Sequence, residues 1–291
     1  YGILSGMDSR LLRQFLNLAE ALHFGKASEA SHVSPSALSR SIQQLEAEVG
    51  VALFSRDRRS VALTHEGRLF LPYAREALTE WDAIRNTLMA EADELHGEVS
   101  MYCSVTASYS FLFEILSAFR RDHPHIEIKL HTGDPELAIT RVLAGEEDIA
   151  IGARPEVLPN GLAFRPITTS PLVFIASRNH PQPDSRNWAA TPMILSEGGL
   201  ARSRVDAWFR ARGVQPSIYA QVAGNEAIVS MVSLGFGIGV VPRIVLDNSP
   251  LVDNIRILDI RPKLKAYEVG LFALNRKLRN PVVKAFWSQL Q

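Results

Sequence analysis

Three polar side chains, Ser36, Arg40 and Gln43, recur at spacings of four and three residues within the stretch 33–50. If that stretch is a helix, they share one face, because each residue advances about 100° around the axis. The opposite face is apolar and consists of Leu38, Ile42, Leu45 and Val49. A hydroxyl, a guanidinium and an amide on a face without a carboxylate can bind phosphates and base edges. The competing interpretation is an ordinary amphipathic surface helix.

A second set of polar side chains, Ser104, Thr106 and Ser108, follows an expected strand at 98–104 and precedes an expected helix. Where a strand end meets a helix start, free N–H groups and the helix dipole favour small anions. We therefore expect Ser104, Val105, Thr106 and Ser108 to bind a small anionic metabolite. Further candidates, for which capping and turn chemistry is the competing interpretation, are Thr132, Gly133, Arg202, Arg204 and Asn225, the last as the expected helix cap. Spacing leaves open whether Arg202 or Arg204 faces the ligand.

No arrangement typical of an enzyme emerges from the remaining polar residues. The glycines at 235, 237 and 239 have the wrong last spacing for a dinucleotide loop, and the expected helix precedes the strand. No G-x-S-x-G elbow is present. His123 and His125 have no acidic or cysteine partner at metal-binding spacing. We expect neither enzymatic activity nor a cofactor or metal, and we expect Cys103 to be a core residue.

The elements around the first polar face form a recognisable layout. Apolar periodicity predicts a helix ending near Leu22, a short helix over 26–32, a tight turn, and a longer helix that Ser34 caps and Pro35 begins. This order is typical of a helix-turn-helix. The next stretch, 51–63, predicts a small hairpin with a basic tip. We expect DNA contacts from Ser34, Pro35, Ser36, Ser39, Arg40 and Gln43 in the major groove, and from Arg56, Arg58 and Arg59 along the backbone or minor groove.

The run from Phe15 to Gly67 resembles the winged helix-turn-helix of LysR-type transcriptional regulators. The matching residues are Phe15, Phe24, Ala27, Ala30, Val33, Ser34, Leu38, Ser39, Arg40, Ile42, Leu45, Glu46, Gly50, Leu53, Phe54, Arg56, Leu63, Thr64, Glu66 and Gly67. The chain has Pro35-Ser36 where the family usually has Gln-Pro or similar, which leaves the helix start intact. The resemblance implies double-stranded promoter DNA and RNA polymerase as partners.

A long helix is predicted over 64–97, with a narrow apolar seam formed by Leu71, Ala74, Leu78, Trp81, Leu88, Ala92 and Leu95. Such a seam favours pairing with a second chain, the alternative being a helix packed within one chain. In LysR-type proteins the equivalent segment is a dimerising linker helix, and dimers commonly pair. The resemblance therefore implies a homodimer and further a homotetramer.

After this helix, strands and helices alternate, which predicts a parallel, doubly wound α/β sheet. Expected strands lie at 98–104, 126–131, 148–152, 171–177, 192–196, 218–222, 238–241, 255–258 and 266–274, with helices at 109–122, 135–144, 202–212, 226–234 and 281–290. Two such lobes resemble the effector domain of LysR-type proteins, which is similar to periplasmic binding proteins. The expected domains are 7–64 for DNA binding, 65–96 for the linker helix, and 97–291 for effector binding. Within the last, lobe one covers 97–168 and 265–291, and lobe two 169–264.

Within the family, the stretches 103–110, 126–135, 204–210 and 222–250 resemble activators of the ketol-acid reductoisomerase gene of branched-chain amino acid biosynthesis. That resemblance implies the acetohydroxy acids acetolactate or acetohydroxybutyrate as co-inducer. Two alternatives stay open: a LysR-type regulator responding to another small anionic metabolite, and a solute-binding α/β protein whose helical part serves only dimerisation.

Composition adds constraints but no specific function. The 291 residues contain 31 Lys+Arg and 31 Asp+Glu, so DNA binding must depend on local charge such as the hairpin tip. A single cysteine excludes an intrachain disulfide framework and fits a reducing compartment. No apolar run approaches the length needed to span a bilayer. We expect a cytoplasmic protein with no membrane association, and Met7 as the natural start after an added stretch, 1–6.

Overall fold

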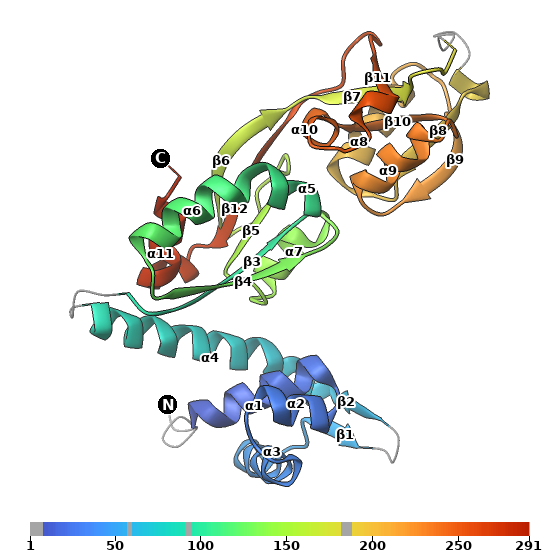
Figure 1. The fold of residues 1–291 in the computed structure, drawn as a ribbon. Helices are drawn as coiled ribbons and strands as arrows, with labels where there is room; N and C mark the ends of the chain where they lie inside the picture. The colour runs from blue at the N-terminus through green and yellow to red at the C-terminus, as the bar shows by residue number, and fades with distance from the viewer. Residues whose placement is uncertain (1–7, 57–59, 91–94, 182–187, 291) are drawn as a thin grey trace. The chain divides into compact units, whose positions relative to one another are not determined.

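The computed structural model describes residues 8–56, 60–90, 95–181 and 188–290 (Figure 1). The chain separates into two compact units, one of residues 1–93 with 144–146 and one of 94–143 with 147–291. Arg58 and Arg59 of the expected hairpin tip, Ala92 of the expected seam and Met7 lie outside the described residues. No helix in the described part combines the length and hydrophobicity needed to span a bilayer.

The head, residues 8–63, is a three-helix domain with a small hairpin. Its elements are α1 (Ser9–Ala21), α2 (Phe24–Ala30), α3 (Pro35–Val49), β1 (Phe54–Arg56) and β2 (Val61–Leu63). The apolar face of α3 is buried, with Leu38, Ile42 and Leu45 fully inside the core, as the periodicity predicts. The strands β1 and β2 pair in antiparallel fashion, which confirms the predicted hairpin. The head therefore has the layout of a winged helix-turn-helix.

Helix α4 (His65–Ala90) is shorter than the predicted helix, and its seam residues are buried near its middle and exposed towards its end. Ala74 and Leu78 are buried in the same core as α1 and α3, whereas Trp81 and Leu88 are 52% and 66% exposed. The predicted seam is therefore wrong at Leu78, because the head itself covers that side chain. It is also wrong at Leu95, which lies beyond the helix and packs against the effector-domain core.

Lobe one of the second unit is a five-stranded sheet in the order β4-β3-β5-β12-β6. Its elements are β3 (Gly97–Cys103), α5 (Val105–Ala107), a π-helical turn (Ser108–Leu112), α6 (Phe113–Asp122), β4 (Ile126–Thr132), α7 (Leu137–Leu143), β5 (Ile149–Ala153), β6 (Leu162–Ser170), β12 (Tyr267–Leu274), a 3-10 turn (Lys277–Arg279) and α11 (Pro281–Ser288). Alternate side chains of β3 point to opposite faces. Met101 and Cys103 pack with α6 and α11, while Tyr102 packs with α7.

Lobe two is a second five-stranded sheet, in the order β11-β7-β10-β8-β9. Its elements are β7 (Leu172–Ser177), a 3-10 turn (Trp188–Ala190), β8 (Pro192–Ser196), α8 (Gly199–Arg210), β9 (Ser217–Val222), α9 (Asn225–Ser233), β10 (Ile238–Pro242), α10 (Arg243–Asp247), a 3-10 turn (Val252–Asn254) and β11 (Ile255–Leu258). Helix α8 covers one face through Trp208 and Phe209, and α9 with α10 covers the other through Ile228 and Val245.

The predicted parallel pairing is correct for only part of each sheet. Strand β3 pairs with β4 and β5 in parallel, and β8 pairs with β9 and β10 in parallel. Strand β12 instead runs antiparallel to β5 and β6, and β7 runs antiparallel to β10 and β11. In lobe one the antiparallel strand is the returning one, because β12 enters the sheet in the opposite direction after the chain comes back from lobe two. Strand β6 has no counterpart among the predicted strands.

Two connections join the lobes (Figure 1). Strand β6 passes into β7 through Pro171 alone, and residues 259–266 lead from β11 back to β12. Helix α8 binds the returning segment: Trp208 Nε1 donates to the carbonyl of Pro262 at 2.7 Å, and Arg204 donates to that of Lys265 at 2.9 Å. The segment between the lobes is therefore anchored on lobe two.

Candidate DNA interface and effector cleft

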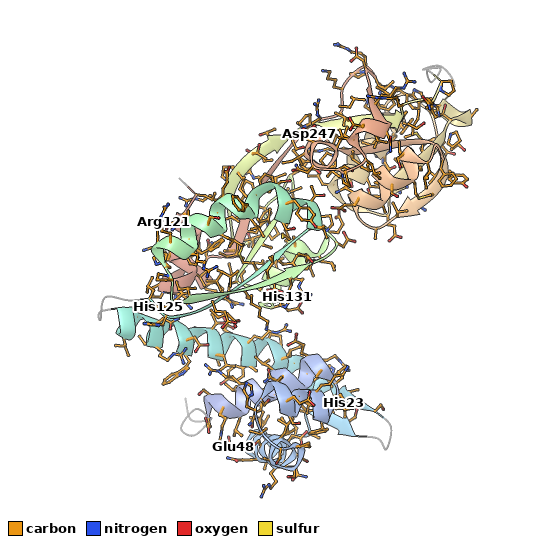
Figure 2. All side chains as sticks on the ribbon, viewed as in Figure 1. His23, Glu48, Arg121, His125, His131 and Asp247 are labelled. Carbon is orange, nitrogen blue, oxygen red and sulfur yellow. The ribbon has the colours of Figure 1, made fainter. Side chains whose placement is uncertain are left out.

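The turn before α3 is fixed by side-chain caps. Ser34 accepts a hydrogen bond from the N–H of Ala37 at 3.2 Å, and Pro35 occupies the first helical position. Before α2, the Nδ1 atom of His23 accepts from the N–H groups of Gly25 and Lys26 (Figure 2). These caps begin both helices of the motif at defined residues.

The polar face of α3 is open to a partner in this unit. Ser36, Arg40 and Gln43 are exposed together with Ser34 and Pro35, while Ser39 is partly buried. Ser34 and Ser36 share a hydroxyl–hydroxyl contact of 3.1 Å. Of the three hairpin arginines, Arg56 is the last residue of β1, and Arg58 and Arg59 lie outside the described residues. Five of the six candidates at the start and along α3 are thus exposed, and Ser39 is partly exposed.

A cavity of about 320 Å³ lies between the two lobes of the second unit. Lobe one contributes the loop before α7 and the end of β5, and lobe two contributes the starts of α8 and α9. Tyr267, at the point where the chain re-enters lobe one, closes part of its wall. This is the position that the carboxyl ends of strands and the helix starts of an α/β protein provide for a small ligand.

Carboxylates dominate the polar lining of this cavity. Asp134, Glu136, Glu156 and Glu197 line it, and the described lining residues include neither lysine nor arginine. Burial, and secondarily the carboxylate of Asp134, raises the pKa of Glu136. The Glu136 carboxylate fills the space beside the α-carbon of Gly199, where a Cβ would collide with it. Gly199 also has a φ of +81°, which favours glycine. Both this backbone conformation and the lack of space for a Cβ therefore require glycine as the first residue of α8.

A smaller cavity of about 60 Å³ is lined by several of the same residues. It is largely apolar, with Phe111, Ile151 and Val245 among its walls, and it contains Ser104 and Thr106 as hydroxyl-bearing residues. Pro135, Gly152, Ala153, Asn225 and Tyr267 line both cavities. The cleft therefore combines a larger cavity that carries the carboxylates with a smaller, largely apolar cavity beside it.

The predicted hydroxyl segment divides between the cavity and solvent. Ser104 and Thr106 line the smaller cavity, whereas Val105 is 41% exposed and, like Ser108, is not among the lining residues. The Ser104 hydroxyl accepts from the N–H of Ala107 at 3.1 Å, which leaves its own proton to donate. The Ser108 hydroxyl donates to the carbonyl of Val105 at 2.6 Å. Ser108 also begins the π-helical turn, where the sequence predicts a regular helix from Tyr109.

The remaining candidates lie around the cleft with different environments. Asn225 lines both cavities, but Gly224 and not Asn225 occupies the capping position, so that part of the prediction is wrong. Thr132 is exposed at the end of β4. Gly133 packs against the hydroxyl of Tyr102, where a Cβ would collide. Neither Thr132 nor Gly133 is among the lining residues, although the next residue, Asp134, is.

Both candidate arginines use their guanidinium groups outside the cavity lining. Arg202 donates to Gln221 at 2.6 Å, to the carbonyl of Ser196 and to Asp206, both at 2.9 Å. Arg204 donates to the Lys265 carbonyl, and its guanidinium lies over the Tyr267 ring at 5.4 Å. Burial lowers the pKa of Arg204. Its buried Nε has no hydrogen-bond partner within the described part of the chain.

Glu226 bonds to the other lobe and is not among the effector-binding residues expected from the sequence. It lies in the first turn of α9, in lobe two, and its Oε1 accepts hydrogen bonds from both the N–H and the hydroxyl of Thr106 in lobe one. Its only local signal is an acidic residue near a helix start, which is common in proteins. The partner lies 120 positions away in the sequence, so no local pattern indicates this contact.

The fold and both units of the chain have counterparts in known proteins. The model of the bacterial regulatory helix-turn-helix protein, lysR family, matches residues 9–68, and the model of the LysR substrate binding domain matches residues 92–291. The chain belongs to the LysR family of transcriptional regulators. The family confirms the predicted class, a regulator and not an enzyme, and sets aside the alternative of a solute-binding protein with a helical dimerisation part.

Among curated relatives, the transcriptional activator IlvY of Salmonella typhimurium is 42% identical over 98% of this chain and 99% of its own length. The transcriptional activator IlvY of Haemophilus influenzae is 40% identical over 98% and 100%. These relatives agree with the branch of the family that the sequence stretches resemble.

Solved structures show the same architecture. A full-length OxyR variant from Pseudomonas aeruginosa superposes with a TM-score of 0.70 at 21% identity, covering 98% of this chain and 95% of that chain. CbnR, a LysR family transcriptional regulator, superposes with a TM-score of 0.65 at 22% identity and covers 98% of both chains. The effector binding domain of QuiR in complex with shikimate covers 67% of this chain and 95% of that chain, with a TM-score of 0.59 at 25% identity.

Proposed function

We propose that this regulator activates the ketol-acid reductoisomerase gene of branched-chain amino acid biosynthesis by binding its promoter. The observation that carries the proposal is the full-length similarity to IlvY activators, which includes both the head and the effector domain. The head supports it with an exposed carboxylate-free face on α3 formed by Ser36, Arg40 and Gln43. Promoter DNA and RNA polymerase are the partners that such an activator needs, and both are found in the cytoplasm.

For the DNA contacts we propose two sets with different roles. Ser34, Pro35, Ser36, Ser39, Arg40 and Gln43 enter the major groove, where a guanidinium or amide reads base edges. Arg56, Arg58 and Arg59 contact the phosphate backbone or the minor groove. The first set would determine the operator sequence and the second would contribute affinity on any DNA.

For the co-inducer we propose an acetohydroxy acid, acetolactate or acetohydroxybutyrate. The cleft supports a small carboxylate with hydroxyl and alkyl groups, because Ser104 and Thr106 offer hydroxyls beside the apolar walls formed by Phe111, Ile151 and Val245. QuiR, whose effector domain has the same fold, is described in complex with shikimate. Val105, Ser108, Thr132, Gly133, Arg202, Arg204 and Asn225 remain proposed contributors to effector binding.

We also propose that α4 pairs two chains into a homodimer and that dimers pair into a homotetramer. Trp81, Ile84 and Leu88 support pairing, because large apolar side chains on α4 are 52%, 52% and 66% exposed. A two-fold dimer would require an operator whose half-sites are separated by whole turns of DNA. We also propose the domain limits 7–64 for DNA binding, 65–96 for the linker helix and 97–291 for effector binding.

The effector assignment is tested by acetolactate titration of purified full-length variants. Ser104→Ala removes a hydroxyl that faces the smaller cavity, and we expect the dissociation constant for acetolactate to rise roughly tenfold. Operator affinity without effector should stay within experimental error of the original protein. A Ser104→Ala variant with unchanged acetolactate affinity and impaired operator binding would move the effector site away from this segment. If a screen finds another small anionic acid that binds more tightly, that acid would replace the acetohydroxy acids as the proposed co-inducer.

A further inference from the structure

Thr106 and Glu226 join the two lobes through a single carboxylate oxygen. Glu226 Oε1 accepts from the N–H of Thr106 at 2.9 Å and from its hydroxyl, and Thr106 is 7% exposed. Both donors of this residue therefore face a carboxylate of the protein itself. Hydrogen bonds to an ionised acceptor are about twice as strong as neutral ones, so this contact contributes to the arrangement of the lobes.

The donors that Glu226 engages are the same type of donors that a carboxylic acid effector requires. Thr106 lines the smaller cavity, and a ligand carboxylate placed there would meet its N–H and hydroxyl. We propose that Glu226 is an internal carboxylate that occupies the effector's anion position in the unliganded protein, and that the effector carboxylate replaces it. This inference rests on the proposed effector site at Ser104 and Thr106.

Charge in the cleft favours exchange over addition. The larger cavity is already lined by the carboxylates of Asp134, Glu136, Glu156 and Glu197. An effector carboxylate placed beside Glu226 would add a like charge at close range, which is unfavourable. If Glu226 leaves as the effector binds, the number of carboxylates at Thr106 stays at one. Glu226 lies in the first turn of α9, where the helix dipole favours an acidic residue. The helix dipole does not explain the two hydrogen bonds that Glu226 accepts from the other lobe.

Exchange has a consequence for affinity. The internal carboxylate must be released before the effector can bind. The apparent effector affinity is therefore the intrinsic affinity multiplied by the fraction of molecules in which the site is open. Removing Glu226 should therefore tighten effector binding, which is the opposite of what loss of a ligand-binding residue does. Two hydrogen bonds to a charged acceptor are strong enough for an effect of roughly tenfold.

The experiment measures acetolactate binding by calorimetry to full-length protein and to the Glu226→Ala variant. Glu197→Ala is the matched control, since it removes the same charge from the same lobe, at the larger cavity. We expect Glu226→Ala to bind acetolactate roughly tenfold more tightly than the original protein and clearly more tightly than Glu197→Ala. Thermal unfolding and operator affinity without effector establish that both variants are folded.

Thr106→Val separates failure of the inference from failure of the effector site. In the Glu226→Ala background, Thr106→Val should weaken acetolactate binding more than in the original background. In the original background the same substitution also weakens the bond to Glu226, which partly offsets the loss. If Thr106→Val weakens binding in both backgrounds while Glu226→Ala binds no more tightly than Glu197→Ala, the internal-carboxylate inference is wrong and the effector site stands. If Thr106→Val has no effect in either background, the effector carboxylate lies elsewhere and both are wrong. Weaker binding by Glu226→Ala would identify Glu226 as a ligand-binding residue and contradict the inference.

Discussion

The carboxylate of Glu46 on α3 accepts a hydrogen bond of 2.8 Å from the backbone N–H of Leu53, where the chain enters the hairpin. The same oxygen accepts from the N–H of Phe54 at 3.0 Å. Because Leu53 and Phe54 are buried, these N–H groups have little access to water. One carboxylate thus fixes the start of the hairpin relative to the helix that presents Arg40.

Glu46→Ala should destabilise the head by about 2–3 kcal/mol, because two buried N–H groups lose a charged acceptor. Urea denaturation of the full-length protein, with hydrogen exchange followed in head peptides, measures the change. Glu48→Ala is the control on the same helix: Glu48 is exposed and accepts from Gln44 at 3.0 Å (Figure 2). Its substitution should change stability by less than about 0.5 kcal/mol. Equal effects of the two substitutions would contradict the structural role of Glu46.

Arg40→Ala should weaken operator binding by about 1–3 kcal/mol and relax the preference at one base position, if the guanidinium reads a base. Arg58→Ala should weaken binding to all sequences alike and reduce the slope of log affinity against log salt by about one, as a phosphate contact does. Fluorescence anisotropy with operator and scrambled DNA across salt concentrations measures both. Normal operator binding by Arg40→Ala would make the assignment of the α3 face wrong.

Leu78 and Leu88 provide a matched pair on α4, one buried and one exposed. Leu78 is 7% exposed within the head core and Leu88 is 66% exposed. Leu78→Ala should cost about 2–5 kcal/mol of head stability through the cavity it leaves. Leu88→Glu should leave that stability nearly unchanged and shift the protein from dimer towards monomer in sedimentation velocity. A Leu88→Glu variant that sediments like the original protein would show that the exposed end of α4 does not pair chains.

Cys103 should react slowly with thiol reagents in the folded protein. Burial raises the pKa of this thiol to about 11, and the side chain is fully buried in β3. At pH 8 the thiolate, which is the reactive form, is then about one part in a thousand. Labelling should become fast in denaturant, where the pKa returns to an ordinary value. Rapid stoichiometric labelling of the native protein would contradict the core position of Cys103.

The sequence is most informative where local periodicity and burial coincide. The apolar stripe of α3 is buried as its spacing predicts, and Ser34 and Pro35 begin that helix as capping chemistry predicts. Strand β6 escapes prediction, because Pro166 interrupts a run with little alternation between apolar and polar residues. The π-helical turn at Ser108–Leu112 has no composition signal of its own.

Local sequence patterns do not predict features that arise because the chain passes into lobe two and comes back to lobe one. The antiparallel entry of β12 follows from crossing between lobes, and the bond between Glu226 and Thr106 joins residues from different lobes. The spacing of Arg202 and Arg204 after β8 predicts that one of them approaches the ligand. The structure shows that Gln221, Asp206 and the carbonyl of Lys265 accept from them. Competition between partners inside a fold cannot be read from residue type alone.

The most direct test of the central proposal is transcription in vitro from the promoter of the ketol-acid reductoisomerase gene of the same organism. Purified protein, RNA polymerase and a template with the upstream region are combined with increasing acetolactate, and lactate serves as the control acid. We expect transcript that requires both the protein and acetolactate, and that is lost with Arg40→Ala. Equal transcript with and without acetolactate, or no binding to the upstream region, would contradict it.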